Sequence, residues 1–271
     1  MLLGAALTII TSLGHVSLKG SHYSEYVFLL LCSVIGAITF ILANNLMVVF
    51  IGMEIMSLGL YVLIAMSHEQ RLSKEAAFKY FIMGGFSSAI LLYGVALIFG
   101  TAGTLDLTEL QGLSAQLIGQ NSLFTVGWIF VLCGFGFKVS AAPFHWWTPD
   151  VYQGAPTPLT GFMATVAKVA AFIAFARFIS RTSVAKSESA IMLLQWAAVL
   201  TILIGNIAAI VQDNLKRMLA YSSIAHSGYL LISLVVIGSG GGRQGSAALL
   251  FYLFTYLVTN LGIFAIVTFF E

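Results

Sequence analysis

The sequence predicts an all-α, polytopic membrane bundle of about nine helices, organised as a single transmembrane domain over residues 1–271. Hydrophobic residues make up 59% of the chain and charged residues only 8%, whereas soluble domains carry about 25% charged residues. The mean hydropathy is +0.99. The apolar residues come in long runs rather than short alternating segments. Because backbone groups in lipid must be satisfied within each segment, these runs are expected to be helices.

Nine apolar runs, separated by polar or Gly/Pro-rich breaks, are the predicted helices. They cover residues 1–14, 26–43, 46–66, 76–100, 124–143, 158–178, 192–211, 218–238 and 246–270. A membrane helix needs about 20 residues, so the first run is too short to span comfortably, as if the chain began inside a longer helix. The loops are short, and we expect no extramembrane domain.

The positive charges in the loops predict an orientation. One set of alternate loops holds Lys19, Arg71, Lys74, Lys216 and Arg217. The other set holds Arg181, Lys186 and Arg243, with Arg177 at a helix end. Because cytoplasmic loops are enriched in Lys and Arg, the first set is expected to face the cytoplasm. The net charge of +2 comes without a basic run, so the sequence predicts no nucleic-acid partner.

One predicted helix contains signals for an interruption. Gly134 and Gly136 precede Lys138, and Pro143 follows it. Glycines and a proline around a charge are typical of helices that unwind at membrane depth in transporters. The simpler interpretation is a helix that ends at Pro143, and the sequence leaves both open.

Ionisable residues inside the runs are the candidate functional residues, because a charge at mid-bilayer costs about 3 kcal/mol or more. Glu54 has apolar neighbours for a turn or two on either side and cannot reach an interface. Lys79 lies about a turn and a half into its run, so it could extend to the interface. Alternatively it pairs with Glu54 on the preceding helix, which would lower the cost of both charges.

Lys138 and Lys168 lie deep in the fifth and sixth runs, without a polar end within reach. Burial disfavours the ammonium form of lysine, so a buried lysine is suited to gain and lose a proton near neutral pH. A permanent pair with a carboxylate is the alternative. Since these helices contain more buried bases than buried acids, not all of the bases can be paired, and this imbalance favours a proton relay.

His226 lies in the eighth run among serines and tyrosines, with Ser222 and Tyr229 on the same helical face. Such a polar stripe either holds helices together or lines a hydrated path. His145, beside two tryptophans, is expected near the membrane interface in a structural role.

Other chemistry is not indicated. Cys32 and Cys133 lie in apolar runs and are expected to be small buried hydrophobes. The sequence contains no Cys/His cluster with metal or haem spacing and no phosphate-binding glycine loop. We therefore expect no metal, cofactor or redox centre in this chain.

Three segments resemble one known family, and the resemblance extends over essentially the whole chain. The string FKVSAAPFHWWTPDVYQGAPTP over residues 137–158 is similar to the signature of the antiporter-like membrane subunits of respiratory complex I, NADH-quinone oxidoreductase, in its N-type form. The string KYF at residues 79–81, followed by GGFSSA at 84–89, resembles the sixth helix of that type. The string KRMLAYSSIAHSGY at 216–229 resembles the tenth-helix motif of the superfamily.

The resemblance implies a role for each candidate residue. It assigns Glu54 and Lys79 to a coupling pair, Lys138 to the lysine of a broken helix and Lys168 to the central relay lysine, with His226 next along a hydrated axis. It implies an inverted-repeat fold, with a complete five-helix repeat over 26–178 and a partial second repeat over 192–271. Relative to the family the chain lacks its first helices, the second broken helix and the exit lysine.

The resemblance also implies the setting. The partners are the bilayer, protons, and the neighbouring antiporter-like and small membrane subunits of complex I in a bacterial inner membrane, with an organelle membrane less favoured. NADH, FMN, iron–sulfur clusters and quinone are expected in partner subunits. A cation/proton antiporter or membrane-bound hydrogenase subunit, and a non-conducting scaffold, are the alternatives.

Overall fold

The structure, a computed structural model, describes residues 1–13, 22–66, 71–118, 120–182 and 188–270. Within these ranges seven helices are long and apolar enough to cross a membrane, and two shorter apolar helices accompany them. These helices coincide with the nine apolar runs, which confirms the predicted all-α membrane bundle. The two predicted repeats, 26–178 and 192–271, remain a prediction.

Six of the long helices are continuous, and the seventh is composite. The continuous ones are α2 (Tyr23–Leu42), α3 (Leu46–Ala65), α4 (Arg71–Ala102), α10 (Glu188–Ile210), α11 (Leu215–Gly238) and α12 (Gly242–Phe270). The composite span consists of α8 (Thr157–Phe162), a π-helical segment η2 (Met163–Ala167) and α9 (Lys168–Arg181). The two shorter apolar helices are α1 (Leu2–Ser12) and α6 (Ser122–Lys138).

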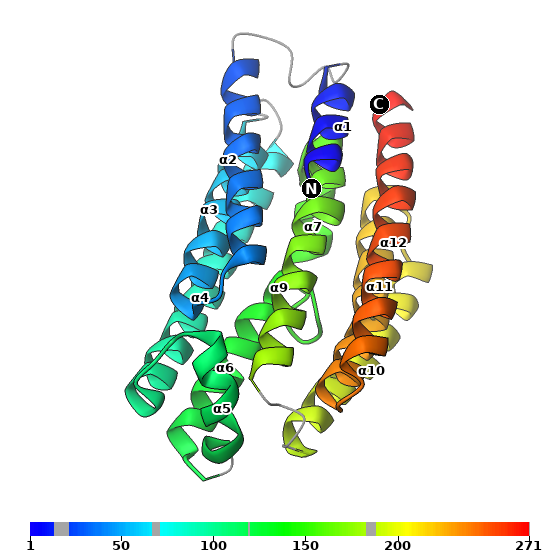
Figure 1. The fold of residues 1–271 in the computed structure, drawn as a ribbon. Coiled ribbons are helices and arrows are strands. Elements are labelled where there is room, and N and C mark those ends of the chain that lie inside the picture. The colour runs from blue at the N-terminus through cyan, green and yellow to red at the C-terminus, as the bar shows by residue number, and fades with distance from the viewer. Residues whose placement is uncertain (14–21, 67–70, 119, 183–187, 271) are drawn as a thin grey trace.

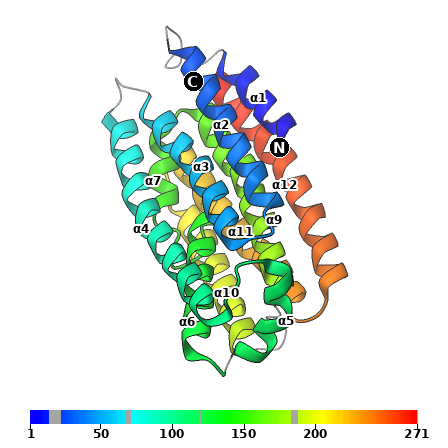
Figure 2. The ribbon, with the colours of Figure 1, turned by 60° about the vertical axis from the view of Figure 1, so that its left-hand side comes forward.

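Two further helices lie where the sequence indicated only loops. α5 (Leu107–Leu117) lies at one end of the bundle, next to the start of α6 (Figure 2). Asp106 caps it by accepting hydrogen bonds from the backbone N–H groups of Thr108 and Glu109, and these bonds, the Thr108 bond foremost, lower the pKa of Asp106. α7 (Trp147–Gly154) follows α6 after a non-helical segment. Both helices are shorter than a membrane span, so hydropathy did not reveal them.

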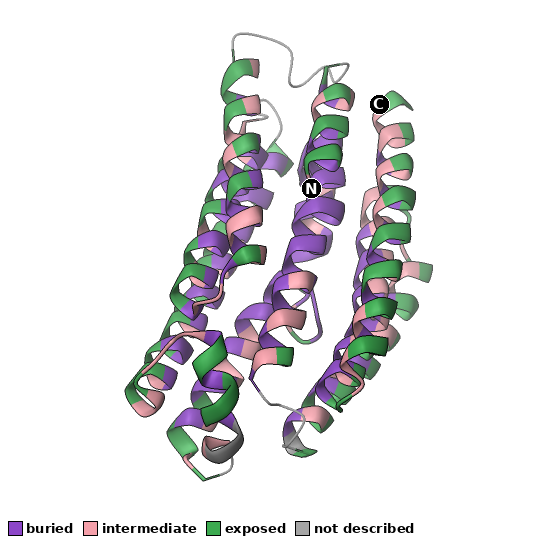
Figure 3. Ribbon diagram, in the orientation of Figure 1, coloured by how far each residue is buried: buried purple, intermediate pink, exposed green. Residues whose placement is uncertain are grey.

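The composite span forms the middle of the molecule. It lies between α2–α4 on one side and α10–α12 on the other (Figure 1). Its most apolar window is 83% buried, against 22–56% for the other spans, and Figure 3 shows the buried residues concentrated along it. A charge on this helix is therefore shielded from lipid and water alike by surrounding helices.

Neighbouring spans approach backbone to backbone where glycines face each other. A Cβ atom built on Gly36 of α2 would lie 2.3 Å from the backbone nitrogen of Met56, and one on Gly52 of α3 would lie 2.5 Å from that of Phe40. Small residues permit such close crossings in membranes, where packing rather than the hydrophobic effect drives helix association.

Gly52→Ala is accordingly expected to lower the unfolding free energy by about 1–3 kcal/mol, because the backbone of Phe40 must move to admit the methyl group. Thermal unfolding of the purified protein in detergent measures the effect. Gly85→Ala is the control, since no atom lies within 4 Å of a Cβ at Gly85. Equal melting temperatures for the two variants would contradict the close crossing.

The described loop cations are grouped as the sequence predicted. Arg217 at the start of α11 and Lys79 near the start of α4 meet at Asp150, so the beginnings of these two helices lie at the same end of the bundle. Arg177 instead donates to the carbonyl of Ile41, where α2 ends. Lys19 and Lys186 lie outside the described residues. The assignment of the first end to the cytoplasm stays a prediction.

Candidate functional site

α6 ends at Lys138. Of the two interpretations that the sequence left open, the structure has the interruption near Lys138 and not a helix that continues to Pro143. Residues 139–146 are not α-helical, and Ser140 adopts a left-handed backbone with φ of 59°. The freed backbone groups find partners within the protein: Thr201 of α10 accepts from the N–H of Ala142 at 2.9 Å, and Trp147 Nε1 donates to the carbonyl of Phe137 at 3.1 Å. Non-helical backbone at membrane depth persists under that condition.

Lys138 is buried and held by a hydroxyl group. Its side chain is 6% exposed, and its Nζ donates to Ser57 Oγ of α3 at 2.5 Å. Ser57 in turn donates to the carbonyl of Met53 at 2.5 Å, so its oxygen is free to accept from the lysine. The ammonium also lies 5.6 Å from the ring centroid of Tyr80, a cation–π distance.

Glu54 lies about one helical turn from Ser57 on α3, and its negative charge acts on Lys138. Its carboxylate accepts a hydrogen bond from Ser88 of α4. Glu54, Ser57 and Lys138 therefore form one cluster, which we call the α3 cluster. It joins α3, α4 and α6 through a carboxylate, hydroxyls and an amine, all groups that can pass a proton.

Lys79 does not join this cluster, contrary to the direct pairing with Glu54 that the resemblance implies. Its Nζ donates to Asp150 at 2.7 Å and to Glu75 at 2.8 Å, and its side chain is 41% exposed. The helices explain the separation. Lys79 and Ser88, the residue bonded to Glu54, are nine positions apart on α4, or about 13 Å along the axis. Helical side chains lean toward their own N-terminus, and the antiparallel α3 and α4 thus direct Glu54 and Lys79 away from each other.

Asp150 on α7 connects Lys79 to α11. Its second oxygen accepts from Arg217 at 2.7 Å, and Arg217 also donates to Gln153 at 3.0 Å. Burial raises the pKa of Asp150, but the hydrogen bonds from Lys79 and Arg217 outweigh it and hold the pKa below its usual value. A polar cavity of about 180 Å³ opens among Lys79, Asp150 and Arg217. No pattern in the sequence had indicated Asp150 or its partnership with Arg217.

Lys168, 3% exposed, begins α9 at the centre of the bundle. All three donors of its ammonium are used: the carbonyl of Ser223 accepts at 2.9 Å, Ser223 Oγ at 2.5 Å and Ser227 Oγ at 2.9 Å. Within the described ranges no salt bridge reaches Lys138 or Lys168. The alternative of a permanent ion pair for these two lysines therefore has no support in the structure.

The π-helical segment η2 directly precedes Lys168. A π-bulge shifts the angular position of every residue after it, and such bulges are frequent at functional sites. Thr165 Oγ1 within the segment donates to the carbonyl of Gly161 at 2.5 Å. This bond gives the Gly161 carbonyl, just before the π-helical segment, a hydrogen-bond partner. The local sequence carries no sign of this feature.

His226 of α11 lies near the hydroxyl groups that surround Lys168. Its Nδ1 is 2.5 Å from the hydroxyl of Tyr252 of α12, and its ring centroid is 5.2 Å from that of Tyr256. The Tyr256 hydroxyl is 2.8 Å from Ser223 Oγ, the atom that accepts from Lys168. Lys168, Ser223, Tyr256, His226 and Tyr252 form the α11 cluster. His226 also contacts Tyr229 of the predicted stripe, with 5.8 Å between the ring centroids. The serines that bind Lys168, Ser223 and Ser227, lie outside that predicted stripe.

The structure brings the five predicted residues into three groups: Glu54 with Lys138, Lys79 with Asp150, and Lys168 beside His226. The hydroxyl groups that connect them were largely missed. Ser57, Ser88, Tyr252 and Tyr256 are common residue types, and only their position opposite a buried charge distinguishes them. The signal available was weak: Glu54 and Ser57 are three residues apart, and so lie on one helical face.

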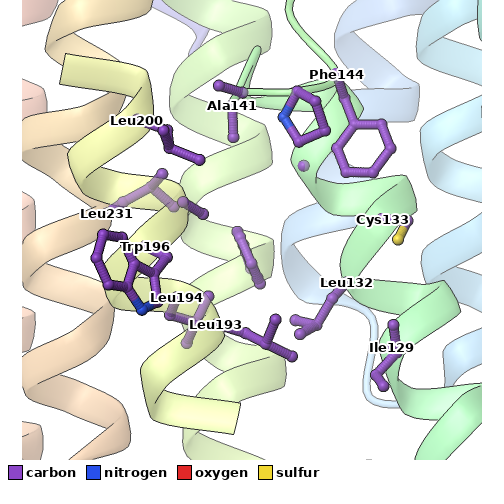
Figure 4. A pocket seen from close by; sticks show the side chains of 15 residues that line it. Ile129, Leu132, Cys133, Ala141, Phe144, Leu193, Leu194, Trp196, Leu200 and Leu231 are labelled. Carbon is purple, nitrogen blue, oxygen red and sulfur yellow. The ribbon is translucent and has the colours of Figure 1, made fainter. Parts of the chain in front are cut away.

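Apolar walls surround the interruption. A cavity of about 310 Å³ lies between α6, α9, α10 and α11 and is lined almost wholly by aliphatic and aromatic side chains, among them Leu132, Phe144, Trp196 and Leu200 (Figure 4). Cys133 lines it too and, like Cys32, is a free, half-buried thiol. Low polarity on this side strengthens the electrostatic interactions of Lys138. Among the described residues no group of His, Cys, Asp and Glu could hold a metal ion.

Comparison with known proteins identifies the family of this chain. Residues 43–271 match the family model described as NADH:quinone oxidoreductase/Mrp antiporter, TM. The chain is 50% identical over 271 residues to the NADH-quinone oxidoreductase subunit N of Bdellovibrio bacteriovorus, covering 100% of this chain and 56% of that protein. The chain thus spans about half the length of the curated relatives it matches.

Two solved structures share the fold. A chain of respiratory complex I from Thermus thermophilus with bound aureothin superposes with a TM-score of 0.80 at 38% identity, covering 98% of this chain and 55% of that one. A chain of the membrane-bound sulfane sulfur reductase, an archaeal respiratory membrane complex, gives a TM-score of 0.84 at 28% identity, with the same coverage of 98% and 55%. With most of its length matched by the family model, this chain belongs to the NADH:quinone oxidoreductase/Mrp antiporter family of transmembrane proteins.

Proposed function

We propose that this chain works as an antiporter-like, N-type membrane subunit of a proton-translocating NADH:quinone oxidoreductase, and that protons pass through Glu54, Lys138, Lys168 and His226, with Lys79 at the surface end. One observation carries the proposal: two lysines are buried in the centre of a membrane bundle with hydroxyl and carbonyl partners and no salt bridge within the described ranges. An amine in that setting can release its proton and take it up again.

In this proposal the chain moves protons and carries no electrons. NADH, FMN, iron–sulfur clusters and quinone belong to partner subunits, and reduction of quinone there drives the movement here. The membrane is the inner membrane of a bacterium, since the curated relative at 50% identity comes from one.

The hydroxyl groups supply steps between the ionisable ones. Ser223 Oγ accepts from Lys168 and lies 2.8 Å from the Tyr256 hydroxyl, so a proton received from the lysine can leave toward α12. No hydrogen bond between described residues joins the α3 cluster to the α11 cluster. Transfer between them therefore requires water, which bridges protein groups at low cost.

The proposal is tested by proton translocation in sealed membrane vesicles that carry the assembled complex. Replacing Lys138 and Lys168 together by methionine is expected to abolish the share of redox-driven proton uptake that this subunit contributes, while electron transfer to quinone persists. The measured quantity is protons moved per NADH oxidised. An unchanged ratio in a fully assembled double variant would show that the chain is a non-conducting scaffold.

The similarity in fold to the sulfane sulfur reductase chain keeps one alternative, a subunit of a related membrane complex or cation/proton antiporter. The higher identity to complex I, 38% against 28%, favours the first proposal. Purification from the native membrane separates the two: association with NADH-oxidising, quinone-reducing subunits is expected. Sodium-dependent transport without those subunits supports the alternative.

A further inference from the structure

Asp150 is the one residue of α7 that reaches both neighbouring spans with its carboxylate. It binds Lys79 of α4 through Oδ2 and Arg217 of α11 through Oδ1, each at 2.7 Å. The three side chains are between 29% and 41% exposed. Exposed ion pairs contribute little to stability, but a carboxylate shared between two helices fixes where both cations lie. Asp150 therefore serves to fix the positions of Lys79 and Arg217 more than to stabilise the fold.

α7 is held from both sides by further contacts. Lys216, next to Arg217, donates to the carbonyl of Ala155 at 3.0 Å, directly after the end of α7. On the opposite side Gly154 lies against α4, where an added Cβ would be 2.5 Å from the carbonyl oxygen of Leu72. The short helix therefore cannot shift without disturbing α4 or α11.

The same helix has contacts near all three lysines of the candidate path. Trp147, its first residue, donates to the carbonyl of Phe137, the neighbour of Lys138. Asp150 binds Lys79. Tyr152 is 1% exposed, and its hydroxyl lies beside Ser223, the partner of Lys168. α7 thus binds Lys79 directly, binds the backbone next to Lys138, and lies beside a partner of Lys168.

We propose that Asp150 is a positioning residue that couples the lysines: by holding Lys79 and Arg217 at once, it sets the place of α7 between Lys138 and Lys168, so that a change at Lys79 is transmitted to α11. This inference rests on the proposed proton path, because the lysines that it couples belong to that path. The distinction from a purely structural role is that the coupling needs the charge of Asp150 and its two partners together.

The test is a double-mutant cycle on protons moved per NADH oxidised, in vesicles with the assembled complex. Asp150→Asn and Arg217→Gln are each expected to lower the share of the ratio that this subunit contributes about fivefold or more, within the range of allosteric coupling. The double variant is expected to be no worse than the more damaged single variant, because both substitutions break one interaction. Asp150→Glu and Arg217→Lys, which keep the charges, are expected to recover most of the ratio.

Asp213→Asn is the matched control, because Asp213 is an exposed carboxylate just before α11; it is expected to leave the ratio unchanged. Multiplicative losses in the double variant, or full activity in Asp150→Asn, overturn the inference. If Asp150→Asn fails to assemble, Arg217→Gln is the deciding variant, because it leaves the Lys79–Asp150 bond intact. Normal proton translocation in Arg217→Gln would also overturn the inference.

The two proposals fail differently. If the Lys138/Lys168 double variant translocates protons normally, the path itself is wrong, whatever Asp150 does. If that variant is inactive while the Asp150 and Arg217 variants are normal, the path holds and only the coupling through α7 is wrong.

Discussion

Lys168→Met is expected to reduce the proton translocation of this subunit by about two orders of magnitude, the contribution typical of a positioned proton-transferring group. Lys168 offers the only amine in the α11 cluster, and its three hydrogen bonds to Ser223 and Ser227 hold that amine toward Tyr256 and His226. Methionine fills a similar volume without a proton to give. Proton uptake per NADH oxidised, in vesicles with verified assembly, measures the loss.

Lys168→Arg separates a relay from a fixed charge. Arginine keeps a positive charge but cannot release its proton at physiological pH. A relay predicts that Lys168→Arg is as inactive as Lys168→Met, whereas a lysine needed only as a cation predicts recovery. Lys74→Met is the control, because Lys74 is exposed at the start of α4. Recovery in Lys168→Arg, with Lys74→Met normal, would remove Lys168 from the path.

Glu54→Gln has the second largest expected effect, at the other end of the path. Lys138 is buried against Ser57, and the negative charge of Glu54 opposes its desolvation in part. Without the charge of Glu54 the protonated form of Lys138 is less favoured, so Lys138 is expected to be neutral in the variant and the proton translocation of this subunit to fall at least tenfold. The same vesicle assay measures this loss.

Variants at and near Glu54 show whether the loss of translocation comes from removing its charge. Glu54→Asp keeps the charge and is expected to retain part of the activity. Ser57→Ala removes only the hydroxyl acceptor, for which about 1–3 kcal/mol is typical, and is expected to be milder than Glu54→Gln. Glu188→Gln, at the exposed start of α10, is the control. If Glu54→Gln equals this control, Lys138 does not depend on Glu54.

The helices of the candidate site could be located from the sequence because a buried charge is conspicuous in an apolar run. Lys138 and Lys168 stand out without any knowledge of the fold, and both are buried in the structure. The interruption after Lys138 was also foreseeable, since glycine and proline act locally on the backbone. α5 and α7 were not foreseeable, because short helices outside the spans leave no hydropathy signal.

The pairing of the charges could not be predicted from the chain alone. The residues left open whether Lys79 reaches the interface or pairs with Glu54, and the family resemblance implied the pair. In the structure its bonds go to Glu75 and Asp150. Which side chains meet depends on the rotation and offset of each helix along its axis. Neither quantity follows from the spacing within one helix.

By itself, the sequence determined that this protein is a helical membrane bundle. It also determined which ionisable residues cost free energy to place within the membrane: Glu54, Lys79, Lys138, Lys168 and His226. Transfer free energies are properties of single residues and segments, so they can be read in order along the chain. Only the tertiary structure decided that serine and tyrosine hydroxyls hold the lysines and that Asp150 joins α4 to α11. Hydrogen bonds of this kind depend on distances of a few ångströms between helices remote in sequence, and packing of the whole bundle sets those distances.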